Sequence, residues 1–406
     1  MQLQKTDTAM TVSKFALGCL APFVAFFSHM SVFAQEQHED GQPSPDTACL
    51  EATLTGVGGP PPNRGVAQSG VFVRYGTLAN GCDGVRLQFD AGRGVIMRLS
   101  EIKGQKPPRF VTPQSLDGLF ITHGHSDHTS SLPDIISTRW VLSKNDGQFG
   151  DSALPRGRYK ALPVFCAGKT CQTVKKATAM WKRYEIPHRK KSDFRKTTPK
   201  ADMRMFAAED EASVIWEQGD VSVSAISVSH IEDSVGFRVD TPAGSVCVSG
   251  DTGLSQNLQR MCAGATVMIH DVVHPVLAAM ASAPPDGSHP NFVSIMESVY
   301  ESHTDVEALS AFNGAFDLLV MTHMTPGVGA GGFQGIPLGP YLGRVDPNRR
   351  AGPLRASDFC TALRAGGYTG NAHIGVDLMA IKIAGGAISS INAPDDHATG
   401  CARLPE

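Results

Sequence analysis

Residues 121–128 read Ile-Thr-His-Gly-His-Ser-Asp-His, which places three imidazoles and one carboxylate within six positions. The strand-like run Gly118–Ile121 leads into this stretch, and a helix-like segment, Leu132–Trp140, follows it. Imidazole is the commonest metal ligand near neutral pH, and a carboxylate oxygen complements it. Alternate residues of an extended chain point the same way, so His123 and His125 can share one metal ion. Beyond the turn, the last two residues of the stretch can face a second ion.

The spacing His-x-His-x-Asp-His, carried by His123, His125, Asp127 and His128, resembles the signature of the metallo-β-lactamase superfamily. The resemblance implies an α/β fold, a four-layer αββα sandwich, with two zinc ions bound at one edge. Manganese or iron(II) would suit the same ligands. By this resemblance the first zinc is bound by His123, His125 and His230, the second by Asp127, His128 and His323, and Asp251 bridges both.

Similar residues recur at the ends of other apolar runs. A His or an Asp follows directly after such a run at His123, His230, Asp251, His270 and His323. In order along the chain, we expect the strands that carry them over residues 118–121, 221–229, 245–249, 267–269 and 318–321, and a closing strand pair over 372–383. One such His is usually structural, but five residues at corresponding strand ends indicate a single site along one sheet edge.

The N-terminus is typical of an export signal. Lys5 and Lys14 precede the apolar run Phe15–Phe27, and residues 32–34 are suited to cleavage before Gln35. The apolar run is too short to span a bilayer comfortably. We therefore expect a periplasmic or secreted protein with no transmembrane span in the mature chain. The expected parts are a signal peptide over 1–34, a flexible leader over 35–47, a catalytic domain over 48–390 and a C-terminal tail over 391–406.

Removal of the signal would leave eight cysteines, at positions 49, 82, 166, 171, 247, 262, 360 and 401. An even number of cysteines in an exported chain indicates disulfides. Cys166 and Cys171 are the best candidates for a local pair, whereas the sequence leaves the other pairings open. Metal binding by these cysteines is the weaker alternative, because the chain has no Cys-x-x-Cys pair.

Residues 156–204 are the basic segment of a chain whose formal net charge is −3. They contain fifteen Lys or Arg residues against three acidic ones. We expect a strand over 161–165, a helix over 173–184, and loops at His188–Lys191 and Arg195–Lys196. A basic surface attracts polyanions such as nucleic acid, and the alternative is a solvated face without a partner.

The triplet Gly250-Asp251-Thr252 decides between substrate classes. It is similar to the Gly-Asp-Thr of ribonuclease Z and of related phosphodiesterases and arylsulfatases, whereas true β-lactamases with this His motif lack the bridging carboxylate. The resemblance implies an exported form of this branch, a zinc-dependent hydrolase whose metal-bridging hydroxide attacks a phosphodiester or a related phosphate or sulfate ester. Its substrate would be a small or anionic ester, and Asp127 would orient the attacking water.

Ribonuclease Z also has His-Glu-Ala-Thr and His-Ser-Thr segments that together help to protonate the leaving oxygen. The similar segments here begin at His270 and His303. They imply His303 as the general acid and Asp271 as its partner, in place of a Glu that is one methylene longer. The alternative for His303 is a helix-start residue without chemistry. An Asp-x-Gly turn like Asp90-Ala91-Gly92 supports the metal site in this family, and an ordinary hairpin turn is the alternative here.

Two departures set the chain apart from ribonuclease Z. Only a short hairpin, with strands over 235–239 and 245–249, fits where that family has the arm that grips transfer RNA. Pro62 and Gly65 stand where that family has a Lys and an Asn, although Arg64 is kept.

Other functions stay open on the sequence alone. One is a lactonase, β-lactamase or other carboxylic ester or amide hydrolase of the same fold, in secondary metabolism for example. Another is an exported zinc-binding protein without turnover. The loop Gly327–Pro353, with Arg344, Arg349 and Arg350, would hold an anionic group of the substrate, unless it is a surface excursion. The oligomeric state is open, a homodimer included.

Overall fold

The computed structural model describes residues 44, 46–105, 109–142, 160–192, 197–285, 288, 290–349, 351–394 and 399–402. The signal expected over 1–34 lies outside these residues, as do most of the leader and the expected loop residues Arg195 and Lys196. Within the described ranges, no helix is long and apolar enough to cross a membrane.

The first sheet has eight strands in the order β17-β16-β1-β2-β3-β4-β5-β6. Their bounds are β1 (Ala48–Gly56), β2 (Gly70–Thr77), β3 (Val85–Phe89), β4 (Gly118–Ile121), β5 (Leu162–Ala167), β6 (Ala201–Phe206), β16 (Ala380–Ala384) and β17 (Ala387–Asn392). Strands β3 to β6 are mutually parallel. Their carboxyl ends therefore lie at one edge of the sheet, and β4 leads directly into the His-x-His-x-Asp-His stretch.

The second sheet has seven strands in the order β15-β12-β11-β10-β9-β8-β7. Their bounds are β7 (Ser213–Gln218), β8 (Val221–Ser227), β9 (Val235–Thr241), β10 (Gly244–Val248), β11 (Ala265–Val273), β12 (Phe316–Thr325) and β15 (Asn371–Ile374). Strands β10, β11, β12 and β15 are parallel. The antiparallel β9–β10 pair confirms the short hairpin expected from the sequence.

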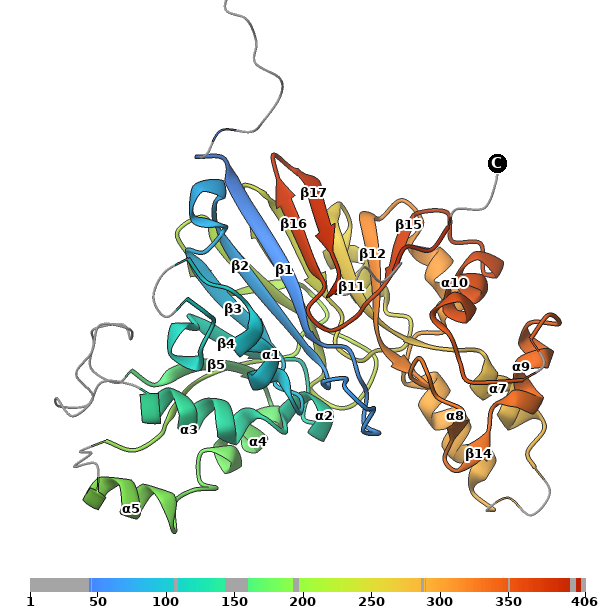
Figure 1. Ribbon diagram of the computed structural model, residues 1–406, viewed down its shortest axis with the longest axis horizontal. Coiled ribbons are helices and arrows are strands. Elements are labelled where there is room, and N and C mark those ends of the chain that lie inside the picture. The colour runs from blue at the N-terminus through green and yellow to red at the C-terminus, as the bar shows by residue number, and fades with distance from the viewer. Residues whose placement is uncertain are drawn as a thin grey trace, which may run out of the picture. The chain divides into compact units, whose positions relative to one another are not determined.

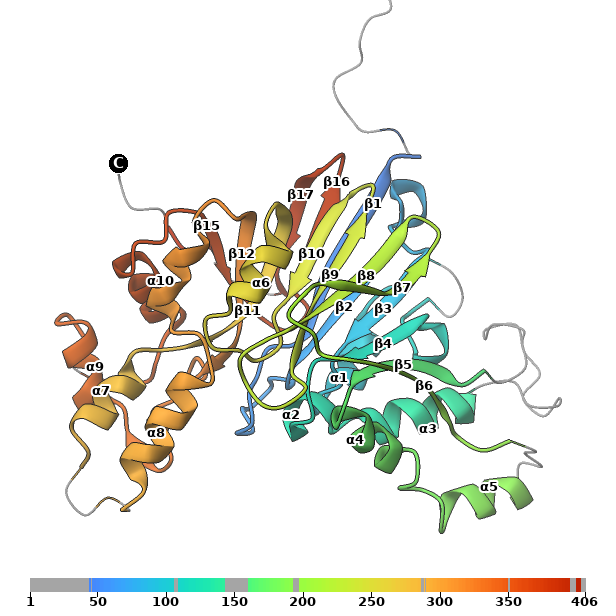
Figure 2. The same ribbon diagram turned by 180° about the vertical axis from the view of Figure 1, so that it is seen from behind.

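The two sheets face each other across an apolar core. Phe89 and Phe120 of the first sheet lie with their ring centroids 5.5 and 5.8 Å from that of Phe237 in the second. Helices cover both outer faces (Figures 1 and 2). On the first sheet's side these are α1 (Val95–Glu101), α2 (Ser126–Thr129), α3 (Leu132–Leu142), α4 (Thr170–Ala177) and α5 (Glu185–Ser192). On the second sheet's side they are α6 (Gln256–Cys262), α7 (Val276–Ser282), α8 (Phe292–Glu301), α9 (Gly339–Val345) and α10 (Ala356–Ala365).

This order of layers is the αββα sandwich, so the expected fold class is confirmed. Helices α1, α3 and α4 share one apolar cluster with the outer face of the first sheet. Helices α6 to α10 share another with the outer face of the second. The remaining short elements are the 3-10 helices over Leu78–Asn80, Pro113–Ser115 and Val306–Phe312, and the small hairpin of β13 (Gly332–Phe333) and β14 (Ile336–Pro337).

Three expectations about local structure are wrong. The helix expected over 173–184 ends at Ala177, and residues His188–Lys191 belong to α5 rather than to a loop. Glu185 begins α5 and pairs with Arg189 one turn later, while three cations lie in the last turn. This charge order stabilises a helix through its dipole, which a count of charges does not reveal. The pair expected over 372–383 is split, because β15 joins the second sheet and β16 the first.

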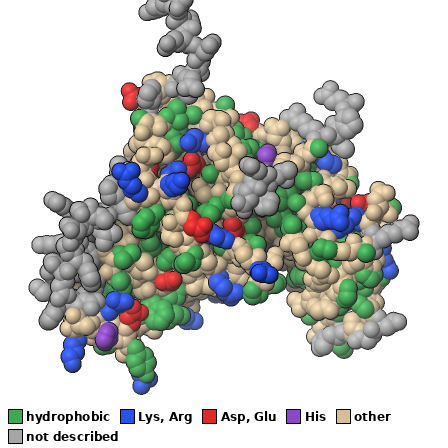
Figure 3. Space-filling model, in the orientation of Figure 1, with side chains coloured by type: hydrophobic (Ala, Val, Ile, Leu, Met, Phe, Trp, Pro, Cys, Tyr) green, Lys and Arg blue, Asp and Glu red, His purple; other side chains and the backbone are tan. Residues whose placement is uncertain are grey.

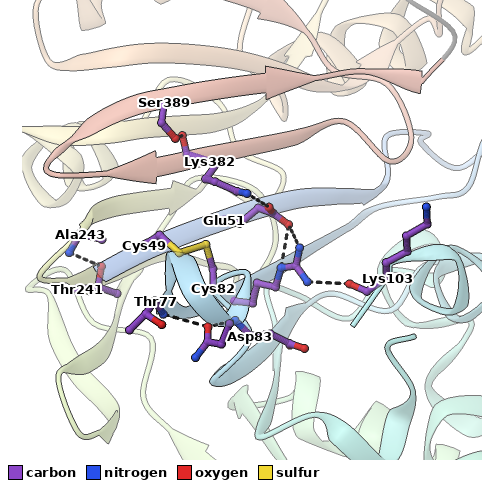
Figure 4. The surroundings of a disulfide bond; sticks show 12 residues. Cys49, Glu51, Thr77, Cys82, Asp83, Lys103, Thr241, Ala243, Lys382 and Ser389 are labelled. Carbon is purple, nitrogen blue, oxygen red and sulfur yellow. Dashed lines mark hydrogen bonds and ion pairs between the residues drawn. A yellow bond between two sulfur atoms is a disulfide. The ribbon is translucent and has the colours of Figure 1, made fainter. Parts of the chain in front are cut away.

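Four disulfides confirm the expectation from the cysteine count. The bonds are Cys49–Cys82, Cys166–Cys171, Cys247–Cys262 and Cys360–Cys401. Figure 4 shows the first of them, which joins β1 to the segment after β2, beside the Glu51–Lys382 ion pair. The last ties the chain's end to α10, and the Cys401 amide also donates to the carbonyl of Ala372. The described part of residues 391–406 therefore packs against the domain.

Phe120→Ala should test how far the inter-sheet core holds the fold together. The Phe120 ring is fully buried and stacks on Phe89 and Phe165 at centroid distances of 5.0 and 4.5 Å. We expect the free energy of unfolding, measured by denaturant titration of the oxidised protein, to fall by about 3–5 kcal/mol. The matched control is Phe110→Ala, because Phe110 is 45% exposed and its loss should cost less than about 0.5 kcal/mol. Equal losses for the two variants would contradict this account of the core.

Candidate metal centre

Asp90 holds the turn after β4 in place through contacts with Thr122 and His128. The Asp90 carboxylate accepts hydrogen bonds from the Thr122 amide at 2.8 Å and from the Thr122 hydroxyl, and it lies 2.7 Å from Nδ1 of His128. Asp90 has a φ of +56°, a conformation that non-glycine residues rarely adopt and that often occurs at functional sites. A Cβ on Gly92 would lie 2.2 Å from the Asp127 carbonyl oxygen, so only glycine fits there. The Asp90-Ala91-Gly92 turn therefore supports the stretch, as the resemblance implied.

The second sheet approaches the same turn. The Val235 amide at the start of β9 donates to the Thr122 carbonyl oxygen at 3.0 Å, which joins the two sheets directly at this edge. Asp251 follows β10, and His230 follows β8, which runs in the same direction as β10 because both are antiparallel to β9. The two sheets therefore present these side chains to the turn at a common edge.

His323 lies inside β12, which continues to Thr325, so the expectation that the strand stops before it is wrong. The pairing of β12 with β11 is interrupted opposite this residue, and His323 has a φ of +45°. Such an irregularity re-aims a side chain without ending the strand. It lets a residue within β12 reach the common edge.

All seven predicted ligands come together in two groups that share Asp251. The first group is His123, His125, His230 and Asp251, and the second is Asp127, His128, His323 and Asp251, with ligand atoms in each lying within 4.8 Å of one another. Asp251 has one carboxylate oxygen 3.2 Å from Nε2 of His128, and the other lies 3.4 Å from Nε2 of His323 and 3.7 Å from Nε2 of His123. One buried carboxylate therefore lies between the two groups.

The donor atoms fit divalent cations. Nε2 of His123, Nε2 of His128 and Oδ1 of Asp251 are buried and have no hydrogen-bond partner within the described structure. Leaving buried polar atoms without partners is costly, and a bound cation would satisfy all three. Imidazole nitrogens with carboxylate oxygens are a donor set that suits zinc.

Burial prepares the imidazoles of the first group to bind metal. Burial lowers the pKa of His123 well below its ordinary value, and it lowers the pKa of His125 and His230 as well. These rings are therefore neutral near pH 7, with a lone pair available for a cation. Burial opposes ionisation of Asp251, but His128 and His323 outweigh it and hold the pKa of that carboxyl well below its usual range. The shared ligand is therefore an anion.

A second set of contacts orients the rings. Nδ1 of His230 donates to the Ser302 carbonyl at 2.8 Å, and Nδ1 of His128 donates to Asp90, so each ring turns Nε2 toward the centre. Nδ1 of His123 lies 3.1 Å from the Thr122 hydroxyl. Sequence reasoning missed Ser302, because a backbone carbonyl has no residue-type signal. Thr122 could have been found, since it immediately precedes the first ligand.

His303 lies at the border of the centre and is held by Asp271. Nδ1 of His303 is 2.9 Å from Oδ2 of Asp271, and the same oxygen accepts from the Thr252 amide at 3.2 Å. The His303 ring stacks on His323 at 5.3 Å, and its side chain is 10% exposed. Its ligand nitrogen lies within 4.8 Å of the carboxylates of Asp251 and Asp271. The predicted pairing of His303 with Asp271 is therefore present.

His270 does not join the centre, so its inclusion among the site residues at strand ends is wrong. It lies within β11, shares the strand face of Met268 and Val272, and packs edge-on against Phe312 in the helical layer. Successive strand residues face opposite ways, so Asp271 points into the space between the sheets and His270 away from it. The Nδ1 atom of His270 lies 2.6 Å from its neighbour's carbonyl oxygen.

The segment 327–353 is not a structureless loop. It contains β13, β14 and α9, and Arg349 is held by Asp358 at 2.9 Å and by the Pro353 carbonyl. The Arg344 guanidinium lies over the Tyr341 ring, and Arg350 is outside the described residues. Anion binding by these arginines stays a prediction.

Residues 86–324 match the family described as the beta-lactamase superfamily domain, which is more than half of the chain. The protein belongs to the metallo-β-lactamase superfamily. The ribonuclease Z of Mycobacterium avium (strain 104) is 28% identical over 305 residues, which cover 73% of this chain and 95% of that protein. The ribonuclease Z of Mycolicibacterium gilvum (strain PYR-GCK) is 27% identical over 284 residues, which cover 68% and 85%.

Among solved structures, the metallo-beta-lactamase fold protein YhfI from Bacillus subtilis matches with a TM-score of 0.50 at 14% identity, covering 82% of this chain and 99% of that one. This likeness supports the fold alone. The chain is a superfamily hydrolase similar to ribonuclease Z, as expected from its motifs. Between His230 and Asp251 the described structure has only the β9–β10 hairpin, so the expected lack of a long arm at this position is confirmed.

Asp90→Asn should weaken metal binding without unfolding the protein. The substitution removes the charge that orients His128 and keeps the size of the side chain. We expect affinity for zinc, measured by competition with a chromogenic chelator, to fall by about 10–100-fold. The matched control is Asp134→Asn on the exposed side of α3, which should leave affinity unchanged. Unaltered affinity in a folded Asp90→Asn protein would contradict the supporting role of Asp90.

Proposed function

We propose that the protein is a dinuclear zinc hydrolase that cleaves a phosphodiester or a related phosphate or sulfate ester. The observation that carries this proposal is the Asp251 carboxylate, which belongs to both groups of ligand atoms. A shared carboxylate holds two cations close together, and such a pair can clamp both the attacking and the leaving oxygen of an ester. Among the chemistries of this fold, displacement at phosphorus uses both of these contacts.

Two bound cations would supply an activated water as the nucleophile and would draw negative charge from the ester oxygen. The side chains of this chain would do the rest. Asp127, whose Oδ2 is 2.9 Å from Nε2 of His323, would accept a hydrogen bond from the attacking water and orient it. Its pKa is lowered, because the hydrogen bond to His323 and the nearby His128 outweigh burial, so it is available as an acceptor near pH 7.

His303 would protonate the leaving oxygen. Asp271 accepts the Nδ1 proton of His303, which leaves Nε2 as the atom that donates a proton. Burial raises the pKa of Asp271, but hydrogen bonds from His270 and His303 outweigh burial and lower it, so the carboxylate can stabilise the protonated ring. His303 is also 10% exposed, so it can regain a proton from solvent after each turnover.

The comparisons support a phosphodiester substrate but not transfer RNA. The relatives are named ribonuclease Z, and a ribonuclease cleaves phosphodiesters. The short β9–β10 hairpin and the altered loop at Pro62 and Gly65 argue against a transfer-RNA substrate. We also propose that the protein is exported, because four disulfides suit an oxidising compartment.

A basic surface on α5 and on residues 178–184 before it is our candidate for polyanion binding. Figure 3 shows Lys and Arg side chains beside hydrophobic ones over α5, at the lower left of that view. Lys182, Arg183, Lys190 and Lys191 are exposed there, and Tyr184 is 77% exposed between them. Neither group of candidate metal ligands includes a residue of this surface, so it would attract anions without taking part in the reaction.

A panel of esters should rank the candidate reactions. We expect the zinc-loaded protein to cleave bis(4-nitrophenyl) phosphate faster than 4-nitrophenyl sulfate, a lactone or nitrocefin. Asp251→Ala should lower kcat/KM by more than about a hundredfold, because losing one cation removes several kcal/mol of transition-state stabilisation. Asp220→Ala, at an exposed carboxylate, is the matched control and should leave kcat/KM unchanged. Rapid lactam turnover without phosphodiester cleavage would overturn the proposal.

His303→Ala should separate proton donation from a structural role. A nitrophenolate leaves without a proton, so kcat for a nitrophenyl ester should fall less than about tenfold. An alkoxide needs the proton, so kcat for an alkyl ester should fall by about 10²–10⁴-fold. Asp271→Asn should follow the same pattern with smaller losses. Equal losses for both leaving groups would show that His303 only supports the centre.

If the basic surface binds polyanions, the affinity for an oligonucleotide should depend on salt concentration through its lysines. Lys190→Ala/Lys191→Ala should weaken binding of a single-stranded oligonucleotide and lower the slope of log affinity against log salt by roughly one to two. Lys103→Ala, at an exposed lysine outside α4 and α5, is the control and should leave the slope unchanged. An unchanged slope in the double variant would assign these lysines to ordinary solvated surface.

A further inference from the structure

A cavity of about 870 Å³ lies beside the metal centre. It is bounded by the loop over 57–66, by the segment 324–333 that follows His323, and by the turn over 374–378. None of the candidate ligands lines it, so it is distinct from the centre itself. Its volume is in the range that holds a drug-sized organic molecule.

Gly59 lies between this cavity and the His323 ring. Gly59 lines the cavity, and a Cβ built on it would lie 3.1 Å from Cε1 and 3.2 Å from Nε2 of His323. Nε2 of His323 in turn lies 3.4 Å from the shared carboxylate of Asp251. An ester whose reacting group is at the centre could therefore extend across Gly59 into the cavity.

The cavity wall suits an apolar group rather than an anionic one. Val57, Val66, Val328, Phe333, Ile374 and Val376 are among the apolar residues of the wall. Among the described lining residues, Arg98, Glu101 and Asp377 carry the charges, so the wall is net negative.

The charges of the wall compensate one another. Nε of Arg98 donates to Asp377 at 2.9 Å, and Nη1 donates to Glu101 at 2.9 Å. Asp377 also accepts from the amides of Ala67 at 2.7 Å and Val57 at 3.2 Å. The guanidinium of Arg98 is therefore engaged within the wall, and a strand of phosphates would meet a net negative surface here.

Hydrogen bonds hold the loop and the segment that bound the cavity in place. The Gln68 side chain donates to the carbonyls of Gly59 and Pro60, at 3.1 and 2.9 Å, which fixes the loop in front of His323. The Asn63 side chain donates to the Val328 carbonyl at 3.3 Å and joins the loop to the segment after β12. A preformed apolar pocket binds a ligand without the entropic cost of ordering its wall.

We propose that this cavity binds an apolar organic group, about the size of an aromatic ring system, that is part of the ester cleaved at the centre. The proposal rests on the proposed function and adds to it the class of substrate: a small diester with one bulky apolar group, rather than a nucleic-acid strand. Gly59 is then a specificity-determining residue, because the Cβ of any side chain at this position would lie only 3.1 Å from the His323 ring and would fill the space between the ring and the cavity.

The test compares two diesters that share a nitrophenolate leaving group. In methyl 4-nitrophenyl phosphate the second group is small, whereas in 2-naphthyl 4-nitrophenyl phosphate it would fill the cavity. We expect the zinc-loaded protein to prefer the naphthyl ester by roughly 10–100-fold in kcat/KM, mainly through KM. Val328→Trp should raise KM for the naphthyl ester more than about tenfold and change kcat/KM for the methyl ester less than about twofold. Val214→Trp, at a 56% exposed site on β7, is the matched control.

A binding measurement separates the cavity from the reaction. Isothermal titration with 2-naphthol, which has no phosphate, should show binding to the wild-type protein and about tenfold weaker binding to Val328→Trp. If Val328→Trp fails to fold, Ala330→Leu, which adds fewer atoms to the same wall, replaces it.

The outcomes are distinguishable. Loss of both cleavage reactions with 2-naphthol binding intact would overturn the proposed function alone. Equal kcat/KM for the two esters, or equal effects of Val328→Trp on both, would overturn the cavity's role and leave the hydrolase standing. Absence of 2-naphthol binding to the wild-type protein would likewise overturn the cavity proposal.

Discussion

The buried carboxylate of Asp251 is the charge on which the rest of the structure depends. It is 2% exposed at the end of β10, and its oxygens lie 3.2 Å from His128 and 3.4 Å from His323. Burying a carboxylate is unfavourable unless nearby charge compensates it. His123 provides no such charge, because burial holds its pKa well below its ordinary value. His128 and His323 supply part of it, because nearby carboxylates raise their pKa values, and cations at the two ligand groups would supply the rest, so metal binding and folding of this edge are linked.

The centre belongs to neither sheet alone. The first sheet supplies the stretch after β4, and the second supplies His230, Asp251 and His323. Asp90 fixes His128 from one side, and the amide of Val235 reaches the Thr122 carbonyl from the other. The distance between the ligand groups is thus set by the packing of the two sheets. The cavity beside Gly59 is formed by loops outside this edge.

The sequence was sufficient where chemistry is local. The His-x-His-x-Asp-His spacing and the Gly-Asp-Thr triplet predicted five of the seven residues that the structure brings together, and the family resemblance added His230 and His323. The sequence failed for His270, because β11 continues past that residue. Successive residues of a strand face opposite sides of the sheet, and His270 faces away from the centre. It also failed for α5, where a loop was expected over residues 188–191. The helix forms because its acidic residue lies in the first turn and its cations lie in the last turn. The cavity could not be predicted, because three segments from β1, β12 and β15 meet only after the sheets have paired.

The most direct test is anomalous diffraction from a crystal of the zinc-loaded protein, with data collected on both sides of the zinc absorption edge. We predict two anomalous peaks roughly 3.5–4 Å apart, with Asp251 between them. The first peak should lie among His123, His125 and His230, and the second among Asp127, His128 and His323. A single peak, or peaks bound away from Asp251, would contradict the account.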